Sequence, residues 1–269
     1  MPFTVDLFTD GRTRIHALDP RVKLLFVAGA LVLFLRFRSV FVLLAGVLAL
    51  LLLHAAARTP ARRLVGLGKA LLPTNLLIAS LWILFYPSGE AFFEFWRIRL
   101  TWLSVAQGLA LALRIDAMAL AVFLWLYTTD QRRLVRGFVK LGLPYEWGLT
   151  LALALRYIPS FQGLYAQIAD AQQARGLNIH EGSAYRRVRV LMPIFVAMVI
   201  SALRSSEHLA RALEARAFGA RGVRRTTMHD LALRRDDYLA AALLLAAFAA
   251  LLALNILLGF GAHPVSVYR

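Results

Sequence analysis

Long apolar runs, separated by short basic or turn-forming segments, constrain this chain more than any other feature. A helix needs about 20 predominantly apolar residues to cross a bilayer. The 269-residue sequence is 60% apolar, has a mean hydropathy of +0.65 and carries only 17% charged residues. A water-soluble domain is nearer half apolar and a quarter charged. The pattern therefore predicts an all-α, polytopic integral membrane protein.

About five transmembrane helices can be placed on these runs. The first two are separated by a break at 36–39, which predicts the outer turn of a hairpin, with one long tilted helix as the alternative. An aromatic segment at 90–102 follows the third span and is typical of a membrane interface. The predicted spans are 22–35, 40–57, 70–86, 103–127 and 238–260.

Local signals mark where the first helices begin. Asp19 followed by Pro20 predicts a helix start, with Asp19 as the N-cap. Between the second and third spans, residues 58–69 contain four basic residues together with Pro60, Gly66 and Gly68, and this composition predicts a loop.

The composition changes at residue 128. From there to residue 236 the chain carries 17 lysines and arginines against 8 acidic residues. Three helical runs are predicted, at 130–141, 145–176 and 183–218, and the two long ones begin apolar and end polar. The expected division is an N-terminal transmembrane bundle (1–127), a module of long helices (128–236), and a last span with its tail (237–269).

The basic residues also predict an orientation. With four spans ahead of it, the module of long helices shares one side of the membrane with the N-terminus, and 25 of the 31 basic residues fall on that side. Loops rich in lysine and arginine stay in the cytoplasm. The N-terminus and the module are therefore expected to be cytoplasmic.

Two similar segments, AQQARGLN (171–178) and ALEARAFG (212–219), close the two long helical runs. A single arginine at such a place favours the helix C-terminus through the macrodipole, with Gly176 and Gly219 as the C′ glycines. The pair favours a second interpretation, in which each guanidinium makes bidentate contacts inside a groove of a two-subunit partner. The candidate site is Ala174, Arg175, Gly176, Ala215, Arg216 and Ala217.

Several kinds of chemistry lack their residues. The chain has no cysteine, its six histidines form no close ligand pair, and it contains no P-loop. We therefore expect no catalytic residue, cofactor or metal. The net charge of +16 accompanies no nucleic-acid motif, so membrane topology and anionic lipid account for the charge and nucleic acid is not an expected partner.

Two ionisable residues, Arg114 and Asp116, fall inside the fourth predicted span. Ionisable groups at that depth are costly and face protein or water. Two interpretations stay open: a gate or a contact to a partner subunit, and a structural ion pair with another helix.

The sequence resembles the transmembrane T component of energy-coupling factor (ECF) transporters, the vitamin and metal-ion importers of prokaryotes. The residues that carry this resemblance extend over most of the chain. They are LDPRVKLL (18–25), ALRYIPSF (154–161), AQQARGLN, ALEARAFGARG (212–222) and Arg225-Thr226. One position departs from the doubled Ala-Arg-Gly pattern of the family, since Ala217 stands where the family has glycine. We expect the alanine to be tolerated, because the helix is predicted to continue to Gly219.

The resemblance implies a scaffold in the prokaryotic cell membrane that is not itself an enzyme. Two ABC-type ATPases would each take one tip into a groove. A substrate-binding S component would pack on the apolar surface of the coupling helices, for which Leu151, Leu155, Ile194 and Met198 are candidates, with core packing as the alternative. The cargo would be biotin, another vitamin, cobalt or nickel.

Two other classes remain open from the residues alone. One is a membrane-embedded enzyme that uses Arg114, Asp116 and Arg156, although no paired acid and base accompany them. The other is a conventional ABC permease, which would couple through a short loop helix in place of two long helices.

Overall fold

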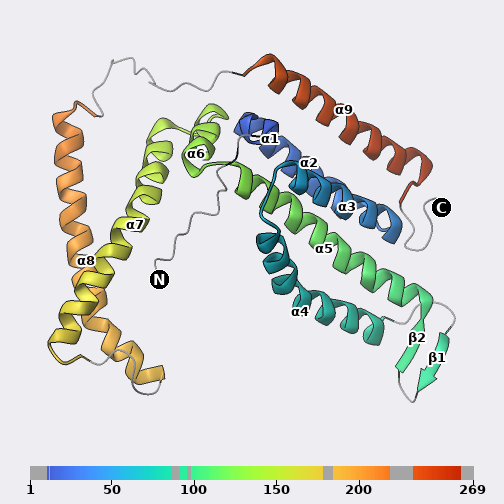
Figure 1. Ribbon diagram of the computed structural model, residues 1–269, viewed down its shortest axis with the longest axis horizontal. Coiled ribbons are helices and arrows are strands. Elements are labelled where there is room, and N and C mark those ends of the chain that lie inside the picture. The colour runs from blue at the N-terminus through green and yellow to red at the C-terminus, as the bar shows by residue number, and fades with distance from the viewer. Residues whose placement is uncertain are drawn as a thin grey trace. The chain divides into compact units, whose positions relative to one another are not determined.

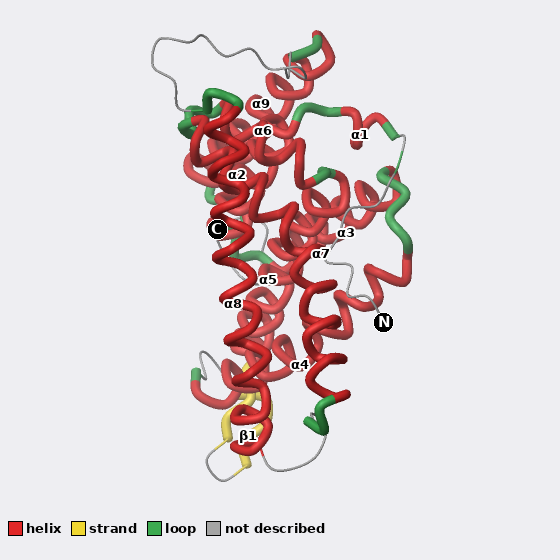
Figure 2. The backbone as a smooth tube through the Cα atoms, turned by 90° about the vertical axis from the view of Figure 1, so that its left-hand side faces the viewer, coloured by secondary structure: helices red, strands yellow, loops and turns green. Residues whose placement is uncertain are grey.

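The structure is a computed structural model that describes residues 11, 13–86, 91–95, 98–177, 184–218 and 233–261. These residues form helices joined by short turns, with one small antiparallel strand pair (Figures 1 and 2). The predicted all-α class is confirmed. The elements are α1 (Arg14–Ala17), α2 (Pro20–Arg36), α3 (Val40–Ala56), α4 (Ala61–Phe85), β1 (Ala91–Phe95), β2 (Ile98–Thr101), α5 (Trp102–Thr128), α6 (Gln131–Lys140), α7 (Tyr145–Ala174), α8 (Ala184–Ala215) and α9 (Arg235–Leu258).

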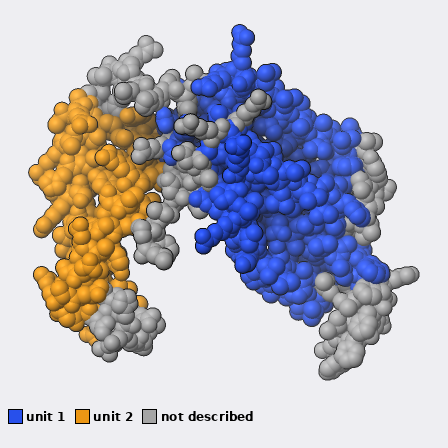
Figure 3. Space-filling view, in the orientation of Figure 1, with its two compact units in different colours: residues 1–143, 231–269 blue, residues 144–230 orange. Residues whose placement is uncertain are grey.

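The chain divides into two compact units, coloured separately in Figure 3. The first, here called the bundle, comprises residues 1–143 and 231–269 and contains α1 to α6, the strand pair and α9. The second, here called the helix pair, comprises residues 144–230 and contains α7 and α8.

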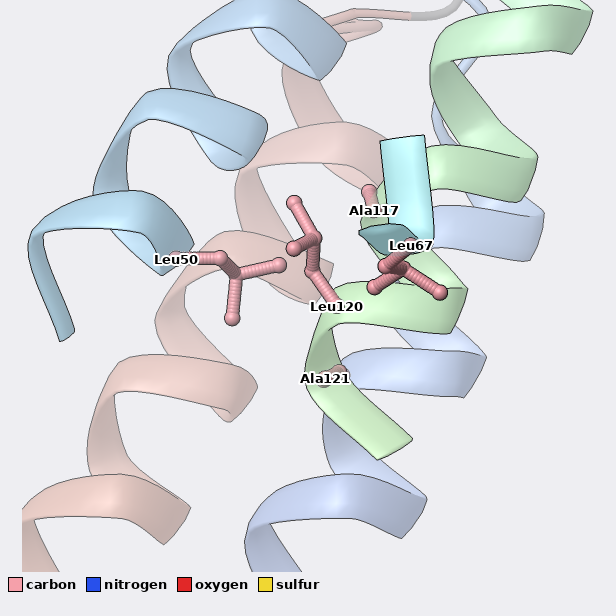
Figure 4. Close-up of a cluster of buried hydrophobic side chains, with 6 residues drawn as sticks. Leu50, Leu67, Ala117, Leu120 and Ala121 are labelled. Atoms are coloured by element: carbon pink, nitrogen blue, oxygen red, sulfur yellow. The ribbon is translucent and has the colours of Figure 1, made fainter. Parts of the chain in front are cut away.

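Helix α5 lies at the centre of the bundle and contacts α2, α3 and α4. It can do so because its buried face carries small residues, and small side chains let helix backbones approach closely. Ala117 and Ala121 are completely buried and pack with Leu50, Leu67 and Leu120 from three helices (Figure 4). This cluster of the apolar core is therefore centred on α5.

The first two helices form the predicted hairpin and not a single long helix. Near the start of α2, Lys23 Nζ donates to the carbonyl of Thr128, 2.7 Å away, and near the end of α3 the ring of His54 lies 6.4 Å from that of Tyr127. Both contacts lie at the C-terminal end of α5, so α2 and α3 run in opposite directions. The turn between them is held by backbone bonds from Arg38 and Ser39 to the carbonyl of Gly261.

Polar side chains join the helix ends of the bundle at the start of α2. This polar junction consists of Asp19, Lys23, Thr128 and Asp237, all at most 6% exposed. Asp19 is the predicted N-cap, since its carboxylate accepts from Arg21 N at 2.9 Å. Its own N–H donates to Asp237 Oδ1 at 2.9 Å, and the other oxygen of Asp237 accepts from Arg234 N at 2.8 Å. One carboxylate on α9 thus satisfies two backbone donors.

One local prediction was wrong, and one local element was not predicted. The basic segment 58–69 is not a loop beyond residue 60, because α4 begins at Ala61 and continues through Gly66, Gly68 and Pro73. Pro60 stands in the N-cap position, and neither Gly66 nor Gly68 has the positive φ that a turn would require. Within the aromatic segment, which the sequence placed at a membrane interface without assigning a fold, β1 pairs with β2 in an antiparallel hairpin.

Within the part of the chain that the structure describes, four helices are long and apolar enough to cross a membrane by length and composition: Ala61–Trp82, Trp102–Thr128, Val188–Ala215 and Arg235–Leu257. Helix α3 is a shorter apolar helix, and α2 has 17 residues. The set contains three of the five predicted spans. It also contains α8, which the sequence placed in the module of long helices, because the apolar first half of α8 dominates its mean hydropathy.

Candidate functional site

The candidate site is built from the C-terminal ends of α7 and α8. Helix α7 ends at Ala174 with Arg175 as its C-cap, and α8 ends at Ala215 with Arg216 in the corresponding position. We call these two ends the arginine tips. The two tips share one backbone arrangement, which the following hydrogen bonds define.

Each tip closes with the pair of backbone bonds that defines a Schellman motif. At the first, Leu177 N donates to Gln172 O at 3.0 Å and Gly176 N donates to Gln173 O at 2.9 Å. At the second, Phe218 N donates to Leu213 O at 2.9 Å and Ala217 N donates to Glu214 O at 2.8 Å. The same turn therefore places an arginine one residue before a left-handed residue in both helices.

The left-handed residue differs between the tips, and here a prediction was wrong. Gly176 has φ +88° and is the expected C′ glycine. At the second tip the helix does not continue to Gly219, which lies outside the described residues. The C′ residue is Ala217, with φ +55°. A left-handed alanine costs about 1–2 kcal/mol relative to the right-handed conformation, so the second tip closes against a conformational penalty that glycine avoids.

All six candidate residues are exposed: Ala174, Arg175, Gly176, Ala215, Arg216 and Ala217. In contrast, the residue after each left-handed position, Leu177 or Phe218, is half-buried. An apolar side chain there accompanies many Schellman motifs and holds the turn to its helix. A rigid turn thus presents an arginine flanked by small residues, and this geometry suits entry into a partner's groove.

The two tips lie at opposite ends of the helix pair. Helices α7 and α8 contact each other and run in opposite directions (Figure 1). The ring of Phe218 after the end of α8 lies 6.3 Å from that of Tyr145 at the start of α7. At 1.5 Å per residue, helices of 30 and 32 residues extend about 45–48 Å. The tips can therefore contact two separate partner subunits at once.

The four candidate platform residues differ in exposure. Leu151 is 40% exposed, Leu155 and Met198 are half-buried, and Ile194 is 1% exposed. The side chain of Ile194 is therefore packed inside the chain. Larger exposed apolar side chains follow α8 on both sides of it: Val188, Met192, Phe195, Val196, Val199 and Leu203.

Arg114 and Asp116 contact different helices of the bundle. Arg114 Nη2 donates to the carbonyl of Phe37 at 2.7 Å, and Asp116 accepts from Asn75 Nδ2 at 2.7 Å. Neither residue forms an ion pair with another described residue, so the predicted structural ion pair was wrong. The side chains instead join α5 to the α2–α3 turn and to α4. Arg156, the third residue of the enzyme alternative, is exposed on α7 in the helix pair.

Among the described residues, no group of three or more His, Asp or Glu side chains could hold a metal ion. Sequence reasoning also missed the polar junction. Its signals were present, since a lysine follows the Asp-Pro-Arg-Val segment and two aspartates open the last apolar run, at 236 and 237. Only the fold shows that they meet.

Comparison with known proteins gives consistent matches. A model of the CbiQ family, described as cobalt transport protein, matches residues 11–228. The energy-coupling factor transporter transmembrane protein EcfT of Acidaminococcus fermentans is 30% identical over 257 residues, which cover 91% of this chain and 94% of that protein. EcfT of Brevibacillus brevis is 32% identical, over 87% and 91%. A protein of Bifidobacterium longum described as an ABC transporter ATP-binding protein is 28% identical over 89% of this chain, and the match covers 32% of its own length.

Proposed function

This chain belongs to the CbiQ family as a non-catalytic transmembrane component of an energy-coupling factor transporter, and from this premise we propose that its arginine tips anchor two ATPases. In this arrangement, ATP binding and hydrolysis move the ATPases, and α7 and α8 carry that motion to a substrate-binding S component. The cargo class is a vitamin or a transition-metal ion.

The observation that carries this proposal is the duplication of one exposed turn. Both Arg175 and Arg216 are C-caps of Schellman motifs, both are exposed, and both are followed by a left-handed residue. One cation near each C-terminus is enough to balance the macrodipoles of α7 and α8, but that role does not call for the same exposed turn at both ends. Two equivalent partner grooves do.

The Bifidobacterium longum relative supports the proposal that the partners of the arginine tips are ATPases. Its matched segment makes up 32% of a protein described as ATP-binding. A single polypeptide that joins such a segment to an ATP-binding protein keeps the two parts at a high effective concentration. We infer that the corresponding ATPases of this chain are separate subunits that bind the tips.

The exposed apolar residues of α8 support the S-component part of the proposal. Apolar side chains exposed on a helix of a membrane protein face either lipid or another membrane subunit, so the S component can pack on this surface. Leu151 on α7 and Met192, Phe195 and Val199 on α8 are exposed. They are the side chains that we assign to the platform, with Leu155 and Met198 beside them and Ile194 supporting them from within.

The basic residues support a cytoplasmic position for the tips. The positive-inside rule applies to short loops near span ends, and 25 of the 31 lysines and arginines fall on the side shared by the N-terminus and residues 128–236. Cytoplasmic tips meet ATPases in the compartment that holds ATP.

The test is charge reversal at both tips. In Arg175→Glu/Arg216→Glu, each groove that accepts a guanidinium meets a carboxylate, so co-purification of the ATPases and uptake should fall more than about 100-fold while the protein still inserts. Each single change should be milder. The matched control is Arg211→Glu, an exposed arginine of α8 that is not a C-cap. Association that survives in the double variant would contradict the proposal.

A further inference from the structure

A cavity of about 280 Å³ lies in the bundle between α4, α5 and the α2–α3 turn. Arg38 from the turn and Arg114 from α5 line it together with Trp82, Gln107, Ala110 and Leu111. Trp82 Nε1 donates to Gln107 Oε1 at 3.0 Å, which joins α4 to α5 at the cavity wall. The described residues that line the cavity include no acidic side chain, so two positive charges face one space without a counter-charge among them.

The hydrogen bonds of these arginines leave most of their donors unused. Among the described residues, Arg114 makes one bond, from Nη2 to the carbonyl of Phe37, and its buried Nε has no acceptor there. The side chain of Arg38 is exposed and makes no hydrogen bond to any described residue. The two guanidinium groups also repel each other, since Arg38 acts on Arg114 as a like charge. An anion in the cavity would satisfy both groups.

The surroundings identify the source of the anion. Leu35 and Phe41, on either side of the turn, are each 60% exposed, as lipid-facing side chains of a membrane protein are. Trp82 stacks on Tyr86 with 4.8 Å between ring centroids, and paired aromatic residues at the end of a span mark the level of the lipid headgroups. The cavity therefore lies where a phospholipid places its phosphate, with apolar surface beside it for the acyl chains.

We propose that Arg38 and Arg114 bind the phosphate of an anionic phospholipid at the α2–α3 turn. Guanidinium groups match phosphate oxygens with two parallel hydrogen bonds. Two arginines with no counter-charge among the described lining residues favour a headgroup with a net negative charge over one whose phosphate is balanced by its own cation. The site also explains why the turn carries basic residues on the side of the membrane that the positive-inside rule leaves poor in them.

The experiment measures lipid binding to the purified full chain by native mass spectrometry, in micelles that contain phosphatidylglycerol or phosphatidylcholine. The wild type should retain phosphatidylglycerol roughly tenfold more tightly than phosphatidylcholine, and Arg38→Gln should remove most of that preference. The control is Arg36→Gln, which changes an exposed arginine two residues away that does not line the cavity.

Three results would overturn the proposal. Equal retention of the two lipids would remove the charge selectivity, and equal loss in Arg36→Gln and Arg38→Gln would reduce it to a general attraction of basic residues. Displacement of phosphatidylglycerol by inorganic phosphate would make the free ion, not the lipid, the ligand. Arg114→Gln should repeat the loss, but it also removes the bond to Phe37, so Arg38→Gln carries the test because it leaves that bond in place.

Discussion

The bundle and the helix pair use charged residues in opposite ways. In the bundle, Asp19, Lys23 and Asp237 are buried, and each makes hydrogen bonds to backbone groups. In the helix pair, Arg175 and Arg216 are exposed at the ends of closed turns. Buried charges persist only where they are paired or hydrogen-bonded, so the first set maintains the fold. The second set stays available for a partner.

The largest effect is expected at the polar junction. Asp237→Ala removes the acceptor of Asp19 N and Arg234 N, and hydrogen bonds to charged groups contribute about 1.5–3 kcal/mol each. We expect the free energy of unfolding to fall by about 3 kcal/mol, measured by thermal or denaturant unfolding in detergent. Asp236→Ala is the control, since Asp236 is the exposed neighbour on the same helix turn. Equal effects of the two changes would show that the junction does not stabilise the bundle.

A smaller effect on stability is expected when a helical glycine is replaced by alanine, and its sign should differ between the bundle and the helix pair. A Cβ on Gly29 of α2 would overlap the ring of Phe248 on α9, which packs against Phe26. Overpacking of this kind costs about 1–3 kcal/mol, so Gly29→Ala should destabilise the bundle. Gly163 of α7 has nothing within 4 Å of the corresponding position. Gly163→Ala should stabilise its helix by about 0.5–1 kcal/mol.

Hydrogen exchange of the amides in α2 and α7 measures both changes in one experiment. Equal increases in amide exchange, in α7 on Gly163→Ala and in α2 on Gly29→Ala, would contradict this prediction. Gly163 would then be packed as closely as Gly29 in the core of the bundle.

The smallest effect concerns the difference between the two tips. Ala217→Gly relieves a left-handed alanine and should stabilise the second turn by about 1 kcal/mol, and Gly176→Ala should destabilise the first by a similar amount. Exchange of the bonded amides of Phe218 and Leu177 reports each turn directly. Both changes should leave the arginines in place, so ATPase binding should change little beside its loss in the double charge reversal.

Loss of ATPase binding in Gly176→Ala as complete as in Arg175→Glu would contradict this prediction. It would mean that the ATPase recognises the absence of a side chain at position 176. The guanidinium would then be secondary, and the presence of Ala217 at the second tip would need another explanation.

The sequence predicted the class of fold and the positions of several helix ends well, because these depend on residues that are close together along the chain. The hairpin of α2 and α3 followed from the break at 36–39, and the N-cap at Asp19 followed from the proline after it. Predictions failed where the amino-acid composition of a segment suggested a loop but its backbone is helical. Glycine and arginine at 58–69 are as compatible with a helix as with a loop, and Pro73 lies inside α4 without ending it.

The second tip shows the same limit at the scale of one residue. Two arginines in similar segments predicted a pair of equivalent helix ends, and both ends are exposed C-caps. The end of α8 was placed at Gly219 because glycine is the usual left-handed residue. The half-buried Phe218, packed on Tyr145, instead accompanies a turn that closes two residues earlier, at Ala217. A contact between residues 73 positions apart cannot be read from local preference.

By itself, the sequence determined that this chain is a helical membrane protein with two arginine-bearing helix ends, because hydrophobic runs and local capping residues depend on neighbours along the chain. Only the tertiary structure decided that Lys23, Thr128 and Asp237 lie in one junction, that the tips lie at opposite ends of the helix pair, and that Arg38 and Arg114 line one cavity. Each of these depends on which helices pack together, and that is set by the summed burial of many side chains distant in sequence.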